Sequence, residues 1–164
     1  MDSSRLGEGA PNMTRTFLLT DIEGSTRQWE ESPEMNDQVE RHFDVLRKAV
    51  EHGGGDVFAM MGDGIAAAFP SADAAVQAAI SAQRDMSPIG LKVRMGVHTG
   101  EAEQRSGDYY GPALNRAARI MSAGHGGQIV VSLASQELLR DALPEGCTLV
   151  DLGEHRLRDL SRPE

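Results

Sequence analysis

Residues 56–69 read DVFAMMGDGIAAAF, and this stretch decides the fold. Two short apolar runs, residues 56–61 and 65–69, flank the triplet Gly62-Asp63-Gly64. Apolar runs of this length predict strands, and a glycine–aspartate triplet between them predicts a tight hairpin. We therefore expect two antiparallel strands with Asp63 at the tip of their turn.

Helical patterns lie on both sides of this hairpin. Upstream, Ser32-Pro33-Glu34 offers a capping serine, a first-position proline and a first-turn acid, which are typical of a helix start. Four apolar residues then recur at helical spacing: Val39, Phe43, Leu46 and Val50. Downstream, the alanine-rich residues 73–86 carry apolar side chains on one face. A helix is therefore expected on each side of the hairpin.

Two further strands enclose this unit. Residues 16–22 (TFLLTDI) form a short apolar run, and residues 91–97 alternate apolar and polar side chains as a half-buried strand does. The resulting order, β-α-β-β-α-β, is the ferredoxin-like order of an α+β fold, in which helices cover one face of an antiparallel sheet. Additional elements are expected after it: a strand at 101–104, a loop at 107–111, a helix at 114–121, a strand at 128–132, a short helix at 135–141 and a last strand at 147–152.

The 164 residues suit one domain, and we expect a flexible lead at residues 1–13 and a single domain at residues 14–164. A formal charge of −9 argues against nucleic-acid binding, which needs clustered Lys and Arg. No apolar run is long enough to span a bilayer, so no membrane partner is expected. The single cysteine, Cys147, excludes an intramolecular disulfide and fits a reducing, cytoplasmic setting. The chain stops without an ending signal, which leaves room for further domains of a longer protein.

Two aspartates stand where metal chemistry would use them. Asp21 follows a buried strand, and Asp63 lies between two glycines at the hairpin tip. If the sheet brings these strands together, both carboxylates can point to one place, and such hard oxygen ligands suit Mg²⁺ or Mn²⁺. The alternative is conformational, because aspartate is common in hairpin turns and at helix N-termini. Spacing alone does not decide between the two.

Four segments in order resemble the catalytic domain of the class III adenylyl and guanylyl cyclases. They are LLTDIEGSTRQWE (18–30), MMGDGIAAAFPSADAAVQAA (60–79), RMGVHTGE (94–101) and GDYYGPALNRAARIMSAGHGGQIVVS (107–132). The likeness covers nearly the whole chain and is specific because all four segments occur at plausible spacing. It implies a homodimer in which two subunits pair head to tail and together build each site.

The resemblance also implies an activity: conversion of ATP or GTP into a 3′,5′-cyclic nucleotide and pyrophosphate. Two Mg²⁺ or Mn²⁺ ions per site would be held by Asp21 and Asp63, with the backbone carbonyl of Ile22 as a further contact. The turn that follows would lie near the phosphates, where free amide groups favour anions. This turn consists of Glu23, Gly24, Ser25 and Thr26.

The partner subunit would complete each site. Asn115 and Arg119 are four residues apart on one predicted helix and so share a face. By resemblance, the amide orients the ribose and the guanidinium stabilises charge on the reacting phosphate. Asp108 matches the position that reads the purine. Either Arg156 or Arg158 is a candidate for the terminal phosphates, although a solvent-exposed arginine is the commoner reading of each.

The chain departs from the family at Ala59, where a lysine usually precedes the Gly-Asp-Gly stretch by three residues. Alanine cannot donate to a base, so the purine pocket lacks the usual partner of Asp108. One lost charged hydrogen bond corresponds to a loss of about 10- to 100-fold. Weak catalysis is therefore expected. The alternatives are a silent nucleotide-binding or regulatory module and a dimerisation domain.

Overall fold

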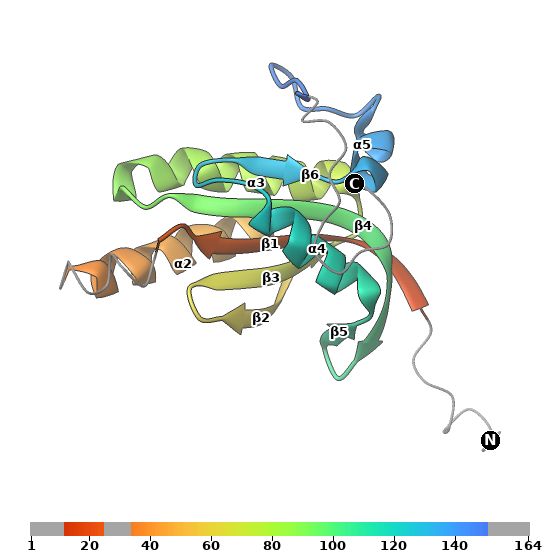
Figure 1. Cartoon of the computed structure of the whole chain (residues 1–164), viewed down its shortest axis with the longest axis horizontal. Helices are drawn as coiled ribbons and strands as arrows, with labels where there is room; N and C mark the ends of the chain where they lie inside the picture. The colour runs from red at the N-terminus through yellow and green to blue at the C-terminus, as the bar shows by residue number, and fades with distance from the viewer. Residues whose placement is uncertain (1–11, 25–33, 151–164) are drawn as a thin grey trace.

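The computed structural model describes residues 12–24 and 34–150. The elements follow the predicted order and are drawn in Figure 1. They are β1 (Asn12–Ile22), α2 (Met35–His52), β2 (Asp56–Met61), β3 (Gly64–Phe69), α3 (Ala72–Met86), the short 3₁₀ helix η2 (Ser87–Ile89), β4 (Val93–Arg105), β5 (Asp108–Tyr110), α4 (Pro112–Ser122), β6 (Ile129–Val131) and α5 (Leu133–Leu139).

Six strands form one sheet within these residues, in the order β2-β3-β1-β4-β5, and β6 also pairs with β4. The pairs along that order are antiparallel, and the β4–β6 pair is parallel. The strands of the predicted βαββαβ unit therefore take the ferredoxin-like order β2-β3-β1-β4, which confirms the predicted fold class.

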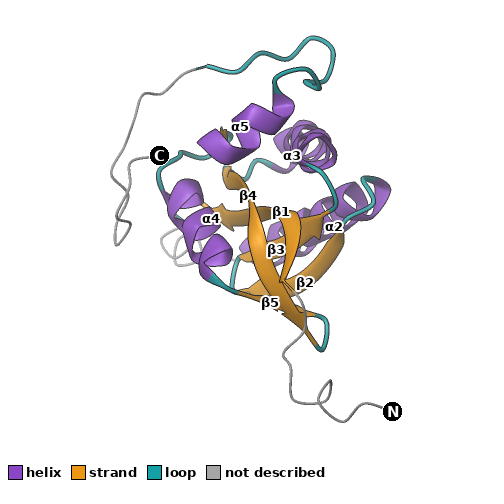
Figure 2. Cartoon of the chain, turned by 90° about the vertical axis from the view of Figure 1, so that its right-hand side faces the viewer, coloured by secondary structure: helices purple, strands orange, loops and turns teal. Residues whose placement is uncertain are grey.

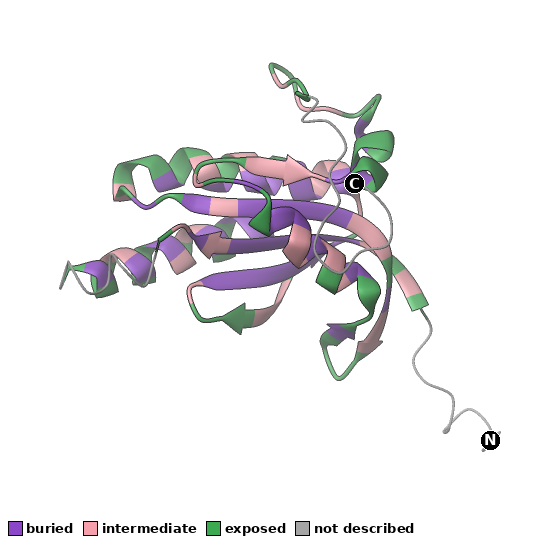
Figure 3. Ribbon diagram, viewed as in Figure 1, coloured by how far each residue is buried: buried purple, intermediate pink, exposed green. Residues whose placement is uncertain are grey.

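Both faces of this sheet are covered. The helices of the βαββαβ core, α2 and α3, pack on one face over Leu18, Ile22 and Ile65. The added helix α4 packs on the other face over Phe17 and Leu19. Figure 2 shows α2 and α3 on one side of the strands and α4 on the other. Burial on both faces explains why β1 and β3 read as continuous apolar runs, and Figure 3 shows β3 buried along its length.

The close approach of α4 to the sheet depends on a glycine in β4. A Cβ atom on Gly96 would lie 2.6 Å from the backbone nitrogen of Met121, which is closer than carbon and nitrogen can approach. Any side chain at this position would therefore push α4 away from the sheet.

Several additional elements differ from the sequence prediction. β4 runs without a break to Arg105, and the predicted loop at residues 107–111 contains the short strand β5. The predicted strand at 147–152 is wrong for residues 147–150, which have no regular structure. The short helix begins at Leu133 because Ser132 caps it, with its Oγ accepting from the Ser135 amide at 3.3 Å.

Some predictions fall outside the described residues: the flexible lead up to residue 11, the helix start at Ser32-Pro33, Ser25, Thr26, and the two C-terminal arginines. Within the described ranges, no helix has the length and apolarity that crossing a bilayer requires.

Candidate functional site

The hairpin tip lies against the end of β1. The Oδ2 atom of Asp63 accepts a hydrogen bond from the backbone amide of Ile22 at 3.2 Å. One residue further into β3, a Cβ on Gly64 would lie 1.6 Å from the Thr20 carbonyl oxygen, so only glycine fits there. The amide of Ile65 then donates to Thr20 Oγ1 at 3.1 Å. These contacts bring the Asp63 carboxylate to the residue that follows Asp21.

The carboxylate of Asp21 is held by an arginine from the neighbouring strand. Asp21 and Arg94 are directly opposite each other in the β1–β4 ladder. The Nε of Arg94 donates to Asp21 Oδ1 at 2.7 Å, and Nη2 pairs with Oδ2. The pair is only partly accessible, with side-chain exposures of 26% for Arg94 and 19% for Asp21. The hydrogen bonds that Arg94 donates to Asp21, aided by the negative charges of Asp21, Glu23 and Asp63, raise the pKa of Arg94 above its ordinary value.

The oxygens gathered here fit a hard divalent cation. The carboxylate of Asp63 accepts from the amide of Ile22, the residue after Asp21, and the Ile22 carbonyl is a third oxygen donor. The described residues contain no cluster of three or more acidic, histidine or cysteine side chains that could enclose a metal. Mg²⁺ does not need such a cage, since it usually keeps several waters and binds one or two carboxylates together with substrate phosphates.

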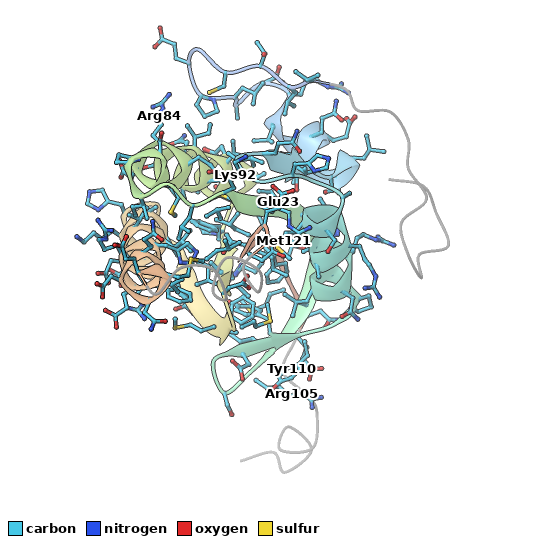
Figure 4. All side chains as sticks on the ribbon, turned by 60° about the vertical axis from the view of Figure 1, so that its left-hand side comes forward. Glu23, Arg84, Lys92, Arg105, Tyr110 and Met121 are labelled. Carbon is cyan, nitrogen blue, oxygen red and sulfur yellow. The ribbon has the colours of Figure 1, made fainter. Side chains whose placement is uncertain are left out.

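Glu23 is engaged in contacts within the chain. Its Oε2 accepts from the amide of Gly126 at 2.9 Å, and its Oε1 lies 3.5 Å from Nδ1 of His125. The hydrogen bond from Gly126 is the main reason that the pKa of Glu23 is lowered. The backbone amide of Glu23 donates to the carbonyl of Lys92 at 2.8 Å, and Figure 4 shows the two residues next to each other.

The prediction of free amides in the turn is therefore wrong for Glu23, because its amide is already paired with a strand carbonyl. Gly24 is exposed, with a φ of +68° that favours glycine. Glu23 thus connects the end of β1 to the loop between α4 and β6.

An aromatic cluster joins β2 to β5. Phe58 and Tyr109 meet edge to face with ring centroids 4.9 Å apart, and Phe17 lies 5.5 Å from Tyr109. The Phe58–Tyr109 contact lies at a bulge in β2, where the pairing with β3 shifts between Val57 and Ala59. Phe58 and Ala59 consequently both pack on the α4 face, whereas Val57 packs on the face of α2 and α3.

The sequence matches the adenylate and guanylate cyclase catalytic domain family over residues 10–162. The chain belongs to this family. An uncharacterised protein of Mycobacterium tuberculosis is 43% identical to this cyclase-family domain over 168 residues, covering the whole chain and 57% of the relative. The chain thus spans little more than half the length of that relative.

Solved structures agree with the family. The adenylate/guanylate cyclase/hydrolase of Silicibacter pomeroyi superimposes on this cyclase-family domain with a TM-score of 0.82 at 27% identity, covering 93% of this chain and 94% of the other. The adenylyl cyclase CyaB of P. aeruginosa gives a TM-score of 0.80 at 25% identity, covering 93% and 92%.

The predicted site residues of the cyclase-family domain fall into two groups. Asp21, Ile22 and Asp63 lie together at the end of β1. Asn115 and Arg119 lie on α4, where Asn115 is exposed and Arg119 is partly buried. Ala59 and Asp108 each neighbour a member of the Phe58–Tyr109 pair, so the structure brings β2 and β5 together at the predicted purine-reading positions.

Sequence reasoning missed the residues that organise both groups. Arg94 lies in the quoted segment RMGVHTGE, but its contact with Asp21 depends on the strand register, which the pattern does not contain. Phe58 and Tyr109 were available as two aromatics next to predicted site residues, and that adjacency is the signal that could have found them.

Proposed function

We propose that this domain converts ATP or GTP into a 3′,5′-cyclic nucleotide and pyrophosphate at a site shared by two copies of the chain. One observation carries the proposal: Asp63 is bonded to the backbone amide that follows Asp21, in a domain of the cyclase family. This arrangement supplies the paired carboxylates that metal-assisted phosphoryl chemistry requires. Two features argue for composite sites. The two aspartates lie on β1 and on the β2–β3 turn, whereas Asn115 and Arg119 lie on α4. Apolar side chains are also exposed beside the purine-reading positions: Met60, Met61 and Tyr110.

Each residue has a role that its position suggests. Divalent ions held by Asp21, Asp63 and the Ile22 carbonyl would activate the ribose 3′-hydroxyl and neutralise charge on the triphosphate. The amide of Ile22 fixes the orientation of the Asp63 carboxylate. Asn115 of the partner subunit orients the ribose. Arg119 of the partner subunit stabilises the negative charge that develops on the reacting phosphate.

The purine pocket is expected to be weak but usable. Asp108 is exposed and can accept a hydrogen bond from an exocyclic amino group; contact at the purine 6-position would favour ATP, because guanine carries a carbonyl oxygen there. Ala59 offers no donor, and its neighbour Phe58 packs against the buried ring of Tyr109. We expect turnover about 10- to 100-fold below that of a complete pocket, since one charged hydrogen bond is missing.

The first experiment measures cyclic AMP and cyclic GMP formed by the purified chain with Mn²⁺ and each triphosphate. The control is the double variant Asp21→Asn/Asp63→Asn, which keeps the shape of both side chains and removes both charges. Product above that control supports the proposal. Equal product from both proteins, at high concentration and with intact folding, would refute it.

A silent nucleotide-binding module is the second candidate. Ala59 favours it, and so does the hold of Arg94 on both oxygens of Asp21. Calorimetry with ATP distinguishes the two functions: binding without turnover supports the module, whereas turnover above the double variant eliminates it.

A further inference from the structure

Arg94 is paired with the carboxylate of Asp21, which the proposed metal site needs as a ligand. Its guanidinium reaches both oxygens of Asp21 from the opposing strand, as a bidentate ion pair. Such pairs are stronger and more rigid than single charged hydrogen bonds. The negative charges of Glu23 and Asp63 also act on Arg94.

A divalent cation on Asp21 would conflict with this pair. An ion bound to either oxygen would lie within a few ångströms of the guanidinium, and like charges at that distance repel strongly in a partly buried setting. About a quarter of the Arg94 side-chain surface is exposed, which gives the side chain access to water when it leaves. The geometry therefore favours exchange of one cation for another.

We propose that Arg94 is a built-in counterion that competes with the divalent metal for Asp21, and that it sets a weak metal affinity in the nucleotide-free protein. This inference rests on the proposed function, because it assumes that Asp21 is a metal ligand. The opposing view is that Arg94 orients Asp21 and stays in place beside the metal. The two views predict opposite effects when Arg94 is removed.

The test measures Mn²⁺ binding by calorimetry without nucleotide, for the wild type and Arg94→Gln. We expect Arg94→Gln to bind Mn²⁺ about tenfold more tightly, because a charge-assisted pair no longer has to be broken. Arg105→Gln is the matched control. It removes the same charge from the same strand, where Arg105 pairs with Glu103 at 2.8 Å. Its affinity should stay at the wild-type value, and unchanged or weaker binding in Arg94→Gln would overturn the proposal.

A second measurement separates metal competition from a purely structural pair. In EDTA, Arg94→Gln leaves Asp21 without its partner, and we expect a lower melting temperature than that of the wild type. Mn²⁺ should raise the melting temperature of Arg94→Gln by more than that of the wild type, because the ion replaces the lost cation. A structural pair would give a deficit that Mn²⁺ does not repair, and this result would also refute the proposal.

A third variant covers the case in which Arg94→Gln does not fold. Arg94→Lys keeps the charge but loses the planar fork, so we expect a rise in Mn²⁺ affinity of about threefold, less than in Arg94→Gln. Absence of any rise in Arg94→Lys would then refute the inference. Assaying cyclic product in the same preparations separates the two ideas. Product with unchanged Mn²⁺ affinity defeats only the counterion inference, and altered affinity without product defeats only the proposed function.

Discussion

The two groups of site residues differ in how exposed they are. The group at the end of β1 is joined by contacts within the chain, since Asp63 is bonded to Ile22 and Asp21 to Arg94. On the α4 side, Asn115 and Asp108 are exposed. Contacts within one chain thus position the first group closely. The proposed composite site therefore predicts that the exposed residues of the second group act on a partner subunit.

The sharpest way to test this comparison is to damage one group in each of two proteins. Asp63→Asn removes a carboxylate from the first group, and Arg119→Ala removes a guanidinium from the second. We expect each variant alone to lose activity by at least about 10²-fold, because each removes charge stabilisation at the reaction centre. An equal mixture should regain about a quarter of the wild-type activity, since about half of the dimers are mixed and each mixed dimer has one intact site out of two.

The pair of variants also contains its own control. Each variant assayed alone at the total concentration of the mixture forms only dimers whose two subunits carry the same substitution, so its activity should stay low. Each protein should keep the wild-type melting temperature within a few degrees. A mixture that remains as inactive as its components, while exchanging subunits, would show that the two groups serve one chain.

The next prediction concerns the incomplete purine pocket. Ala59→Lys places a donor beside β5, and we expect kcat/KM for ATP to rise about 10- to 100-fold as Asp108 regains a partner. Ala142→Lys is the matched control, because it makes the same substitution at an exposed position outside β2 and β5. A similar rise in both variants would mean that general charge, and not the pocket, limits activity.

Local sequence patterns predicted where the first group lies, for a physical reason. Asp63 was placed by a local pattern, the Gly-Asp-Gly turn, and the apolar run of β1 placed Asp21 at a strand end. Arg94 escaped prediction because its contact requires the register of two strands distant in the chain. Local patterns determine elements, but pairing between elements depends on the whole core.

The α4 side shows the same limit. The bulge at Phe58 places Ala59 on the same sheet face as Phe58, and no pattern in the run DVFAMM predicts this bulge. The strand β5 was expected to be a loop because its three residues lie between Gly107 and Gly111. Its pairing with β4 and its contact through Tyr109 come from tertiary packing, which outweighs local preference at such short lengths.

The smallest effect is expected at His98 in β4. His98 is buried, and its Nδ1 lies 2.8 Å from Ser132 Oγ. Burial, and then the charge of Arg116, lowers the pKa of His98 from 6.5 to about 4. Between these values the unfolded chain binds a proton that the folded chain does not, so stability falls as the pH drops from 6.5 towards 4. From pH 7 to pH 5 this linkage is worth about 2 kcal/mol.

Urea unfolding at pH 7 and pH 5 measures this effect when His98→Gln is compared with the wild type. Glutamine can still hydrogen-bond to Ser132 but does not titrate, and the carboxylates contribute equally to both proteins. The wild type should therefore lose about 2 kcal/mol more than His98→Gln on acidification. Parallel losses would mean that His98 becomes protonated within the folded state. Because burial is the main cause of the lowered pKa of His98, such protonation would mean that water reaches the ring in the folded state.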